Sequence, residues 1–399
     1  MTNDNQHIPS GYKPSPLGVI PEDWEVKRLG EIGEVLMCKR IMKYQTDSCG
    51  DIPFFKIGTF GGKPDAYISK EVFDEYKTKY SYPKVGDVMI SAAGTIGRSV
   101  IFDGTPSYYQ DSNIVWIDND NKQVLNKYLY YYYSTINWIT DTGTIPRLYN
   151  GALKAIQIPT PPIEQQKRIV SILEFWDTAI AKQTALIEQL TLRKHGLMQQ
   201  LLTGKKRLKG FEGGNFHRLG NYISECNRRN AGCNRVLSVT NTRGFILQEE
   251  QFDKIVASND TSNYKVVRRG EFAFNPSRVN VGSLAMLNEY DEGILSPMYV
   301  VFKTNENIDK TYLLQCLQSW WFRGHIPAYT QGSVRDSLSF DGLCSMKFYI
   351  PTLQEQKAIS AILERADKEI EIQKQKLAAM QEQKKGLMQV LLTGKKRIK

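Results

Sequence analysis

The sequence predicts an α+β protein with two similar globular domains and two long helices that form an antiparallel coiled coil. Two observations predict this architecture. Residues 161–209 realign on residues 351–399 at a constant offset of about 190, and both segments place apolar residues at helical spacing. We therefore expect a pseudo-two-fold internal repeat of one globular domain followed by one helical region. The expected bounds of the four parts are residues 1–157, 158–209, 210–349 and 350–399.

The repeat is clearest where each helical region ends. Residues 196–207 read GLMQQLLTGKKR, and residues 386–397 read GLMQVLLTGKKR. At the same offset, the tripeptide at 28–30 (RLG) returns at 218–220, where each globular domain begins. Chance does not produce agreement over this length, so the chain contains two copies of one plan.

Each helical region carries an apolar seam with steps of three and four residues, which is a heptad pattern. The first seam consists of Ile169, Ile172, Trp176, Ile180, Ile187, Leu190, Leu197 and Leu201. The second consists of Ile359, Ile362, Ala366, Ile370, Leu377, Met380, Leu387 and Leu391. Polar residues interrupt both seams at equivalent places, namely Gln183 and Lys194 in the first and Gln373 and Lys384 in the second.

These interruptions indicate how the helices pair. In an antiparallel pair the midpoints Gln183 and Gln373 face each other and fix the register, while Lys194 meets the acidic residues near Asp367. The alternative is two unrelated surface helices that each cover their own domain. Each helix ends at Thr-Gly, so Gly204 and Gly394 are expected caps. The Lys-Lys-Arg that follows either complements the negative helix end or contacts phosphates.

The net charge of +10 is concentrated in the helical regions. Residues 1–163 carry 17 basic and 18 acidic side chains, and residues 210–350 carry 15 and 14. Residues 164–209 carry 9 and 4, and residues 351–399 carry 11 and 6. A positive net charge is typical of nucleic-acid-binding proteins. Here, any contact between the globular domains and a nucleic acid must come from local basic patches.

Several classes of protein are not indicated. The six cysteines form no C-x-x-C pair, and four histidines offer little for a metal site, so we expect reduced thiols and no metal. No long apolar stretch or secretory signal occurs, so we expect no membrane association and a cytoplasmic location.

Each globular domain mixes short strands with one longer aromatic-rich helix. These helices are expected at residues 128–139, with five tyrosines, and 312–322, with Trp320 and Trp321. A platform that stacks bases is one interpretation. A half-buried amphipathic helix is the other, because aromatic side chains dominate cores.

Five segments of the chain stand out as motifs: residues 12–24 (YKPSPLGVIPEDW), 86–97 (GDVMISAAGTIG), 264–267 (YKVV), 272–283 (FAFNPSRVNVGS) and 296–302 (SPMYVVF). In this order they resemble segments of the specificity subunits of type I restriction–modification systems. The Ile-Pro pairs at 158–159 and 350–351, each followed by Glu-Gln, resemble the family's lead into its helices. The resemblance covers nearly the whole chain.

This resemblance implies a non-catalytic DNA reader of a restriction system. Its two target-recognition domains would each read one half of an interrupted sequence in double-stranded DNA, with the helices as a ruler. The expected partners are two modification subunits, which are adenine methyltransferases, and ATP-driven restriction subunits. S-adenosylmethionine, ATP and magnesium are expected on those partners and no cofactor on this chain.

Sequence is read at base edges, and phosphate contacts set the register of a protein on DNA. Candidate DNA-binding residues are basic or amide side chains in loops, although each alone could be an ordinary surface charge. They are Lys39, Arg40, Lys43, Arg98 and Arg147 in the first domain, and Arg228, Arg229, Arg243, Arg278, Asn280 and Arg335 in the second. Arg147 and Arg335 hold comparable places, shortly before the Ile-Pro exits.

Other motifs point weakly to enzymes. Residues 275–278 (NPSR) hint at an adenine methyltransferase motif but lack its second proline and aromatic residue. Asp65 with Glu75 and Lys77 has the order of a metal-dependent nuclease site, without a counterpart in the second repeat. We therefore predict no catalytic residues in this chain. A self-contained nuclease with its own recognition domains is the alternative function, and a helical scaffold with no DNA role is a third.

Overall fold

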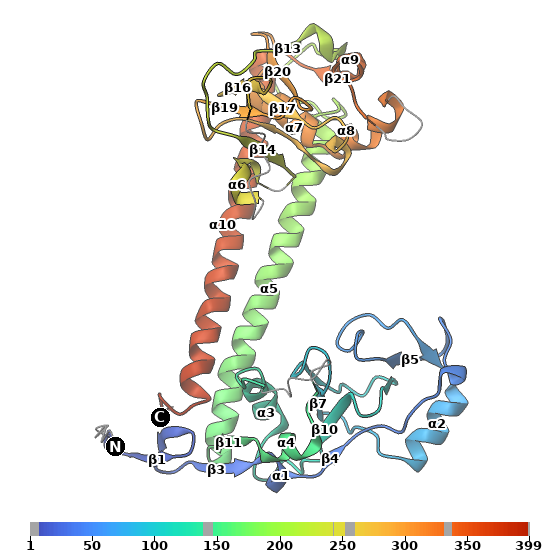
Figure 1. Cartoon of the computed structure of the whole chain (residues 1–399), viewed down its shortest axis with the longest axis vertical. Coiled ribbons are helices and arrows are strands. Elements are labelled where there is room, and N and C mark those ends of the chain that lie inside the picture. The colour runs from blue at the N-terminus through green and yellow to red at the C-terminus, as the bar shows by residue number, and fades with distance from the viewer. Residues whose placement is uncertain (1–7, 139–146, 242, 252–259, 331–336, 398–399) are drawn as a thin grey trace. The chain divides into compact units, whose positions relative to one another are not determined.

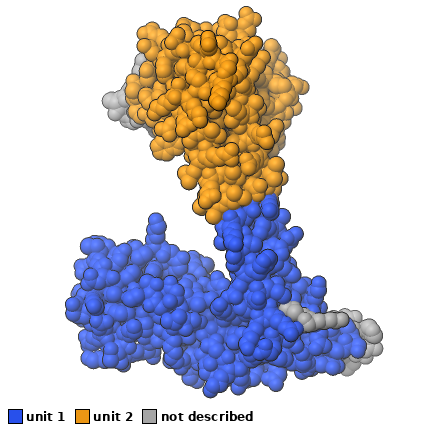
Figure 2. Space-filling view, turned by 180° about the vertical axis from the view of Figure 1, so that it is seen from behind, with its two compact units in different colours: residues 1–183, 376–399 blue, residues 184–375 orange. Residues whose placement is uncertain are grey.

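The computed structural model describes residues 8–138, 147–241, 243–251, 260–330 and 337–397. The chain forms two compact units, which Figure 2 colours separately. Unit 1 comprises residues 1–183 and 376–399, and unit 2 comprises residues 184–375. Each unit therefore combines one globular region with one half of each long helix.

A four-stranded antiparallel sheet forms the centre of unit 1. Its order is β4-β10-β7-β8, with β4 at Val35–Leu36, β10 at Ile114–Ile117, β7 at Val88–Ser91 and β8 at Ser99–Ile101. All residues of β7 and β10 are buried, because both faces of this sheet are covered. Short apolar runs of this kind are typical of central strands.

The other strands of unit 1 form three small groups. They are the hairpin of β1 (Tyr12–Ser15) and β2 (Gly18–Pro21), the pair of β3 (Glu25–Arg28) and β11 (Gln157–Thr160), and the sheet of β6 (Tyr67–Ile68), β5 (Ile52–Phe55) and β9 (Tyr108–Tyr109). The short helices are α1 (Leu29–Ile32), η1 (Lys43–Gln45), α2 (Lys70–Lys79), α3 (Asn126–Tyr133) and α4 (Asn150–Ala155).

Unit 2 repeats this plan. Its central antiparallel sheet has the order β13-β20-β17-β18, with β13 at Ile223–Glu225, β20 at Val300–Thr304, β17 at Phe272–Phe274 and β18 at Leu284–Met286. Around it lie the strand pairs β12 (Asn215–Arg218) with β21 (Lys347–Ile350), β14 (Leu237–Thr240) with β15 (Gly244–Leu247), and β16 (Lys265–Arg268) with β19 (Glu292–Leu295).

The short helical segments of unit 2 do not match those of unit 1 one for one. They are η2 (Leu219–Asn221), α6 (Gln248–Gln251), η3 (Val279–Val281), α7 (Lys310–Gln318), α8 (Trp320–His325), η4 (Ile326–Tyr329) and α9 (Phe340–Ser345). The strand register does repeat, because Arg28 pairs with Gln157 in unit 1 and Arg218 pairs with Lys347 in unit 2. The predicted internal repeat and α+β fold class are confirmed.

Hydrogen bonds of two buried glutamines show how closely the repeat extends to side chains. Gln166 accepts a hydrogen bond from Leu125 N and donates to the Gln123 and Pro161 carbonyls. Gln356 does the same with Asp309 N and with the Asn307 and Pro351 carbonyls. Each glutamine side chain thus ties the first turn of a long helix to its globular region.

The two long helices are α5 (Ile163–Leu201) and α10 (Leu353–Leu391), each of 39 residues (Figure 1). In unit 1 the start of α5 packs against the end of α10, as Leu173 and Leu391 belong to one buried cluster. In unit 2 the end of α5 packs against the start of α10, with Leu201 and Leu363 in one cluster. The helices are therefore antiparallel in each unit, as predicted.

Ion pairs support this antiparallel arrangement. Lys194 Nζ lies 2.5 Å from Asp367 Oδ1, which confirms the contact expected from the sequence. The equivalent pair in unit 1 joins Lys384 and Asp177. Each aspartate also accepts a hydrogen bond from its globular region, from Tyr131 Oη in unit 1 and Gln315 Nε2 in unit 2.

One part of the predicted seam is wrong. Ile362 is 36% exposed, whereas its neighbour Leu363 is completely buried. In the first helix Leu173 is likewise buried, whereas Ile172 is only partly so. The first turns of each helix pack against the globular region as well as the other helix, so the buried face there is wider than a heptad seam.

Both predicted glycine caps are present. Gly204 and Gly394 have φ values of +70° and +73°, a conformation that favours glycine. After each glycine a backbone N–H reaches back to the last turn, from Lys206 to the Gln200 carbonyl and from Lys396 to the Val390 carbonyl, both at 3.1 Å. This is the pattern that ends a helix in a left-handed residue.

The aromatic helices are mostly core elements. α3 buries Tyr128, Tyr131, Tyr132 and Tyr133, so the core interpretation is confirmed for the first domain. The second run is split into α7 and α8 at Ser319, which caps α8. In α8 the core interpretation is wrong for Trp320, which is 80% exposed, because the break at Ser319 turns that side chain outward.

Candidate nucleic-acid interface

Two of the candidate basic residues of the first domain lie at the loop between β7 and β8. Arg147 is exposed and pairs through its backbone with Ala93 in that loop. Arg98 is exposed at the end of the same loop, where its guanidinium donates to the Phe60 carbonyl at 2.8 Å. The segments that carry Phe60, Arg98 and Arg147 are distant in sequence, and these contacts hold the two arginines at one loop.

The other three candidates of this domain, Lys39, Arg40 and Lys43, follow β4. Arg40 Nε donates to Asp111 Oδ2 at 2.9 Å. The turn that holds Asp111 continues to Asn113, whose carbonyl accepts from Ala92 N at 2.7 Å. The turn at residues 110–113 thus links the segment after β4 to the loop between β7 and β8. These contacts connect the position of Arg40 to the loop that carries Arg98.

In the second domain, Arg278 and Asn280 are exposed in the loop between β17 and β18. The hairpin that carries Arg243 lies beside this loop. The hydroxyl of Ser283 donates to the Val239 carbonyl at 2.9 Å, and a Cβ at Gly282 would lie 3.2 Å from that of Asn241. These three candidates therefore share one end of unit 2.

Arg228 and Arg229 lie elsewhere, at a cavity of about 810 Å³ that also contains Arg235 and Arg268. Arg228 is bound to the buried carboxylate of Glu271, so an internal partner occupies part of its guanidinium. Its Nε is buried and makes no hydrogen bond among the described residues. The lining also contains Glu292, which pairs with Arg268 at 3.6 Å, so the basic groups that an anion such as phosphate could meet here are mainly those of Arg229 and Arg235.

Sequence reasoning missed three arginines near the candidates. Arg235 and Arg268 complete the cavity at Arg228, and Arg323 on α8 would contact a side chain placed at Gly282. The concentration of arginine at 228–235 and 268–269 was the available signal. It does not reveal that two separate strands meet at this cavity.

Neither the equivalence of Arg147 with Arg335 nor the pairing of Gln183 with Gln373 is confirmed. Arg335 lies outside the described residues. Leu148 N and Leu338 N donate to the equivalent carbonyls of Ala92 and Pro276, so Arg147 corresponds to Ser337 and not to Arg335, in contrast to the comparable places expected from the sequence. Gln183 is buried in unit 1 and Gln373 is half-buried in unit 2, and their pairing stays a prediction.

The basic tails of the helices have internal partners. Arg207 holds the buried Glu355 through two hydrogen bonds, of 3.0 and 2.6 Å. In unit 1, Arg397 donates to Asp23 at 3.0 Å. These arginines secure the helix ends, whereas Lys205 and Lys206 are exposed.

The enzyme-like motifs have structural explanations. Asp65 pairs with Lys56 at 3.0 Å and Glu75 pairs with Lys79 at 2.9 Å, so the two carboxylates are engaged by different lysines. Asn275 is buried, and its side-chain oxygen accepts from Ser277 N to shape the loop after β17. Within the described residues, no group of three or more His, Cys, Asp or Glu side chains is arranged to hold a metal.

Comparison with known proteins connects this geometry to a family. A sequence profile described as the type I restriction modification DNA specificity domain matches residues 21–192 and 250–382. The two matches cover well over half of the chain and fall once on each repeat. The chain belongs to this type I specificity family.

Curated relatives agree with this membership. A putative type I restriction enzyme specificity subunit of Haemophilus influenzae is 64% identical over 160 residues, which span 40% of this chain and 42% of that protein. The chain thus matches less than half the length of this relative. A putative type I restriction enzyme specificity subunit of Methanocaldococcus jannaschii is 26% identical over 430 residues, covering 97% of both chains.

Solved structures share the fold of this specificity-family chain. The S subunit of a type I restriction–modification system from M. genitalium has a TM-score of 0.54 at 14% identity, over 92% of this chain and 96% of that one. A chain from a study of complex assembly and conformational transition of the type I R-M system has a TM-score of 0.58 at 14% identity, over 94% and 99%. The described part of this chain contains no helix long and apolar enough to cross a membrane.

Proposed function

We propose that this chain is the DNA-reading subunit of a type I restriction–modification complex and that each repeat reads one half of a bipartite target. The observation that carries this proposal is the duplicated framework: two sheets of the same strand order each present a loop with exposed arginine, Arg98 in unit 1 and Arg278 in unit 2. Family membership supports DNA as the ligand.

The candidate residues would divide into two roles. Exposed arginine and asparagine at loop tips, such as Arg278 and Asn280, suit hydrogen bonds to base edges. The arginines at the other cavity, mainly Arg229 and Arg235, suit phosphate contacts, which position a protein on DNA without reading sequence.

The chain would supply recognition, and its partners would supply chemistry. We infer two modification subunits that methylate adenine and restriction subunits that cleave DNA, one modification subunit for each repeat. S-adenosylmethionine, ATP and magnesium would be bound by these partners, and the complex would act in the cytoplasm.

Selection of bound duplexes from a random DNA pool, with the chain and its modification subunits, tests the proposal. The expected result is two short conserved half-sites with a spacer of fixed length. Exchange of residues 1–157 for those of another family member should change one half-site and leave the other intact. A single uninterrupted site, or none, would contradict the bipartite reading.

A parallel reaction distinguishes the nuclease alternative. The purified chain alone is incubated with DNA and Mg²⁺, or with DNA and S-adenosylmethionine. We expect neither cleavage nor methyl transfer until partner subunits are added. Binding that does not weaken steeply with salt would instead favour the scaffold alternative, because phosphate contacts impose salt dependence.

A further inference from the structure

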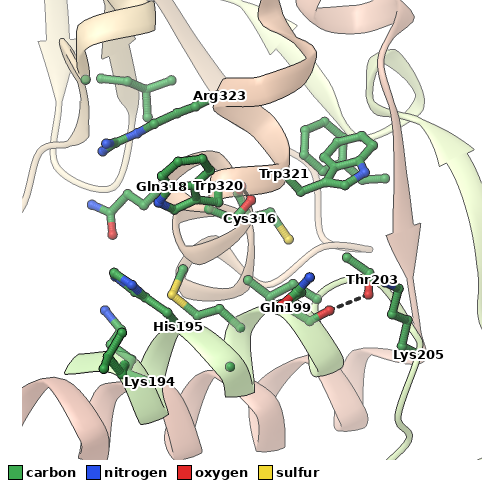
Figure 3. Close-up of a pocket in the computed structure, with 18 of the residues that line it drawn as sticks. Lys194, His195, Gln199, Thr203, Lys205, Cys316, Gln318, Trp320, Trp321 and Arg323 are labelled. Carbon is green, nitrogen blue, oxygen red and sulfur yellow. Dashed lines mark hydrogen bonds between the residues drawn. The ribbon is translucent and has the colours of Figure 1, made fainter. Parts of the chain in front are cut away.

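Unit 2 contains a cavity of about 1140 Å³ beside the loops that carry Arg243 and Arg278, because Asn241 and Gly282 are part of its lining. It lies between the last turns of α5 and the side chains of α8. Figure 3 shows Trp320, Trp321 and Arg323 on one side, and Lys194, His195 and Gln199 on the other. Strands β12 and β21 contribute Phe216 and Phe348 to the same lining.

The cavity has an apolar surface that the described part of the chain leaves exposed. Trp320 is 80% exposed, Leu192 is 68% exposed and Phe216 is 56% exposed. Single exposed apolar residues are ordinary, but a group of large ones around one hollow marks an interaction site. Tryptophan is also the residue type most enriched at the energetic centres of interfaces.

Its charge has one sign. Among the described residues of the lining, Lys194, Lys205 and Arg323 are basic and none is aspartate or glutamate. Lys194 is neutralised by Asp367, but Lys205 and Arg323 make no ion pair among the described residues. An occupant that is apolar on one face and negatively charged at its edges would complement this surface.

The shape fits a peptide segment better than a compact ligand. The lining follows α5 from Leu192 to Leu202, roughly 15 Å at 1.5 Å per residue. Along this face lies Gly196, above which a Cβ would meet open space. Glycine inside a helix costs about 1 kcal/mol relative to alanine; the equivalent Gly386 of α10 has the same open space, so this feature allows close approach to α5 without being specific to the groove.

The groove is also specific to unit 2. In unit 1 the positions equivalent to Leu192 and Phe216 hold Glu382 and Val26, and Trp320 corresponds to Ile136 when counted from the equivalent Tyr128 and Tyr312. A site that served two identical partners would present the same chemistry in both repeats. This groove therefore has one occupant per chain.

We propose that this groove of unit 2 binds one acidic amphipathic segment of a partner protein. Its apolar residues pack on Trp320, Phe216 and Leu192, and its carboxylates meet Lys205 and Arg323. This interaction goes beyond DNA reading and does not require it.

The test uses the full chain and two fluorescent synthetic peptides of about 14 residues, enough to fill the groove as a helix. Both carry leucine and phenylalanine at helical spacing; one has glutamate at the other positions and its twin has lysine. We expect saturable binding of the acidic peptide, measured by fluorescence anisotropy, and at least about tenfold weaker binding of the basic twin.

Each of two groove variants has a matched control in unit 1. Trp320→Ala and Lys205→Glu should each weaken acidic-peptide binding about tenfold. Phe175→Ala removes an aromatic side chain that is 71% exposed, and Lys395→Glu reverses the equivalent lysine in unit 1; both should leave binding unchanged. All four positions are exposed, so the fold should be retained.

A third pair probes the open space over α5. Gly196→Leu should fill the groove and abolish binding, whereas Gly386→Leu, at the equivalent position of α10, should not. Equal binding of both peptides, or no effect of Trp320→Ala and Gly196→Leu, would overturn the proposal. Displacement of the acidic peptide by a single-stranded oligonucleotide would also overturn it, in favour of a nucleic-acid site. No DNA is present in the titration itself, so DNA reading can fail or hold independently.

Discussion

Two buried carboxylates, Asp87 and Glu271, occupy the same turn in the two repeats. Each accepts a 2.8 Å hydrogen bond from a backbone N–H three residues earlier, at Lys84 and Arg268. Their further partners differ, since Asp87 contacts the Asn126 amide and Glu271 contacts a guanidinium. The turn is therefore structural, and among the described residues Glu271 forms an ion pair, with Arg228, whereas Asp87 forms none.

This difference gives unit 1 a pH-dependent weakness. Burial raises the pKa of Asp87, so the protonated carboxyl is favoured in the folded protein. The stability that the protonated Asp87 contributes to the folded state is complete below the ordinary pKa of aspartate. It is lost as the pH rises through the raised pKa of the folded protein. Asp87→Asn should therefore raise the unfolding temperature of unit 1 more at pH 7 than at pH 4. A shift that is equal at both values, in paired thermal scans, would contradict this account.

Arg278 and Arg229 should differ in what they contribute to DNA binding. Arg278→Ala should reduce discrimination at one base position by about 1–3 kcal/mol. Arg229→Ala should weaken binding to all sequences alike and reduce the slope of log affinity against log salt by about one. Competition gel shifts at several salt concentrations measure both effects. Lys374→Ala, an exposed lysine of α10, is the control, and an equal effect of all three variants would argue against separate roles.

Individual helices depend on glycine for two opposite reasons. In α5, Gly196 lies inside the helix near its end with open space around it, whereas Gly204 ends the helix at φ +70°. A Cβ at Gly204 would also lie 2.7 Å from the Tyr349 ring. The first glycine is conformationally unfavourable for the helix, and the second is required by it.

Gly196→Ala should therefore stabilise unit 2 by about 1 kcal/mol, because alanine is the better helix former. Gly204→Ala should destabilise it by about 1–3 kcal/mol, through left-handed backbone strain and contact with Tyr349. Denaturant unfolding of the two variants beside the parent chain measures both changes. Two changes of the same sign would show that the cap geometry does not limit stability.

At the scale of the whole molecule, the continuous helices should set the distance between half-sites. One added helical turn of about four residues lengthens a helix by about 6 Å. Insertion of such a turn at equivalent positions of α5 and α10 should lengthen the selected spacer by one or two base pairs, at about 3.4 Å each. The half-sites should not change. An unaltered spacer in the selected DNA would remove the ruler role.

The sequence by itself determined the repeat, the α+β class, the antiparallel helices, their glycine caps and the pair of Lys194 with Asp367. These features depend on periodicity and on residues at fixed spacing, which are local properties that a sequence displays directly.

Only the tertiary structure decided which side chains remain available. In the structure Arg40 pairs with Asp111 and Arg228 pairs with Glu271. Leu363 is buried where the sequence pattern had predicted Ile362, and Trp320 is exposed beside a groove. Burial and pairing depend on neighbours that are distant in sequence, and no local pattern encodes which segments the fold brings together.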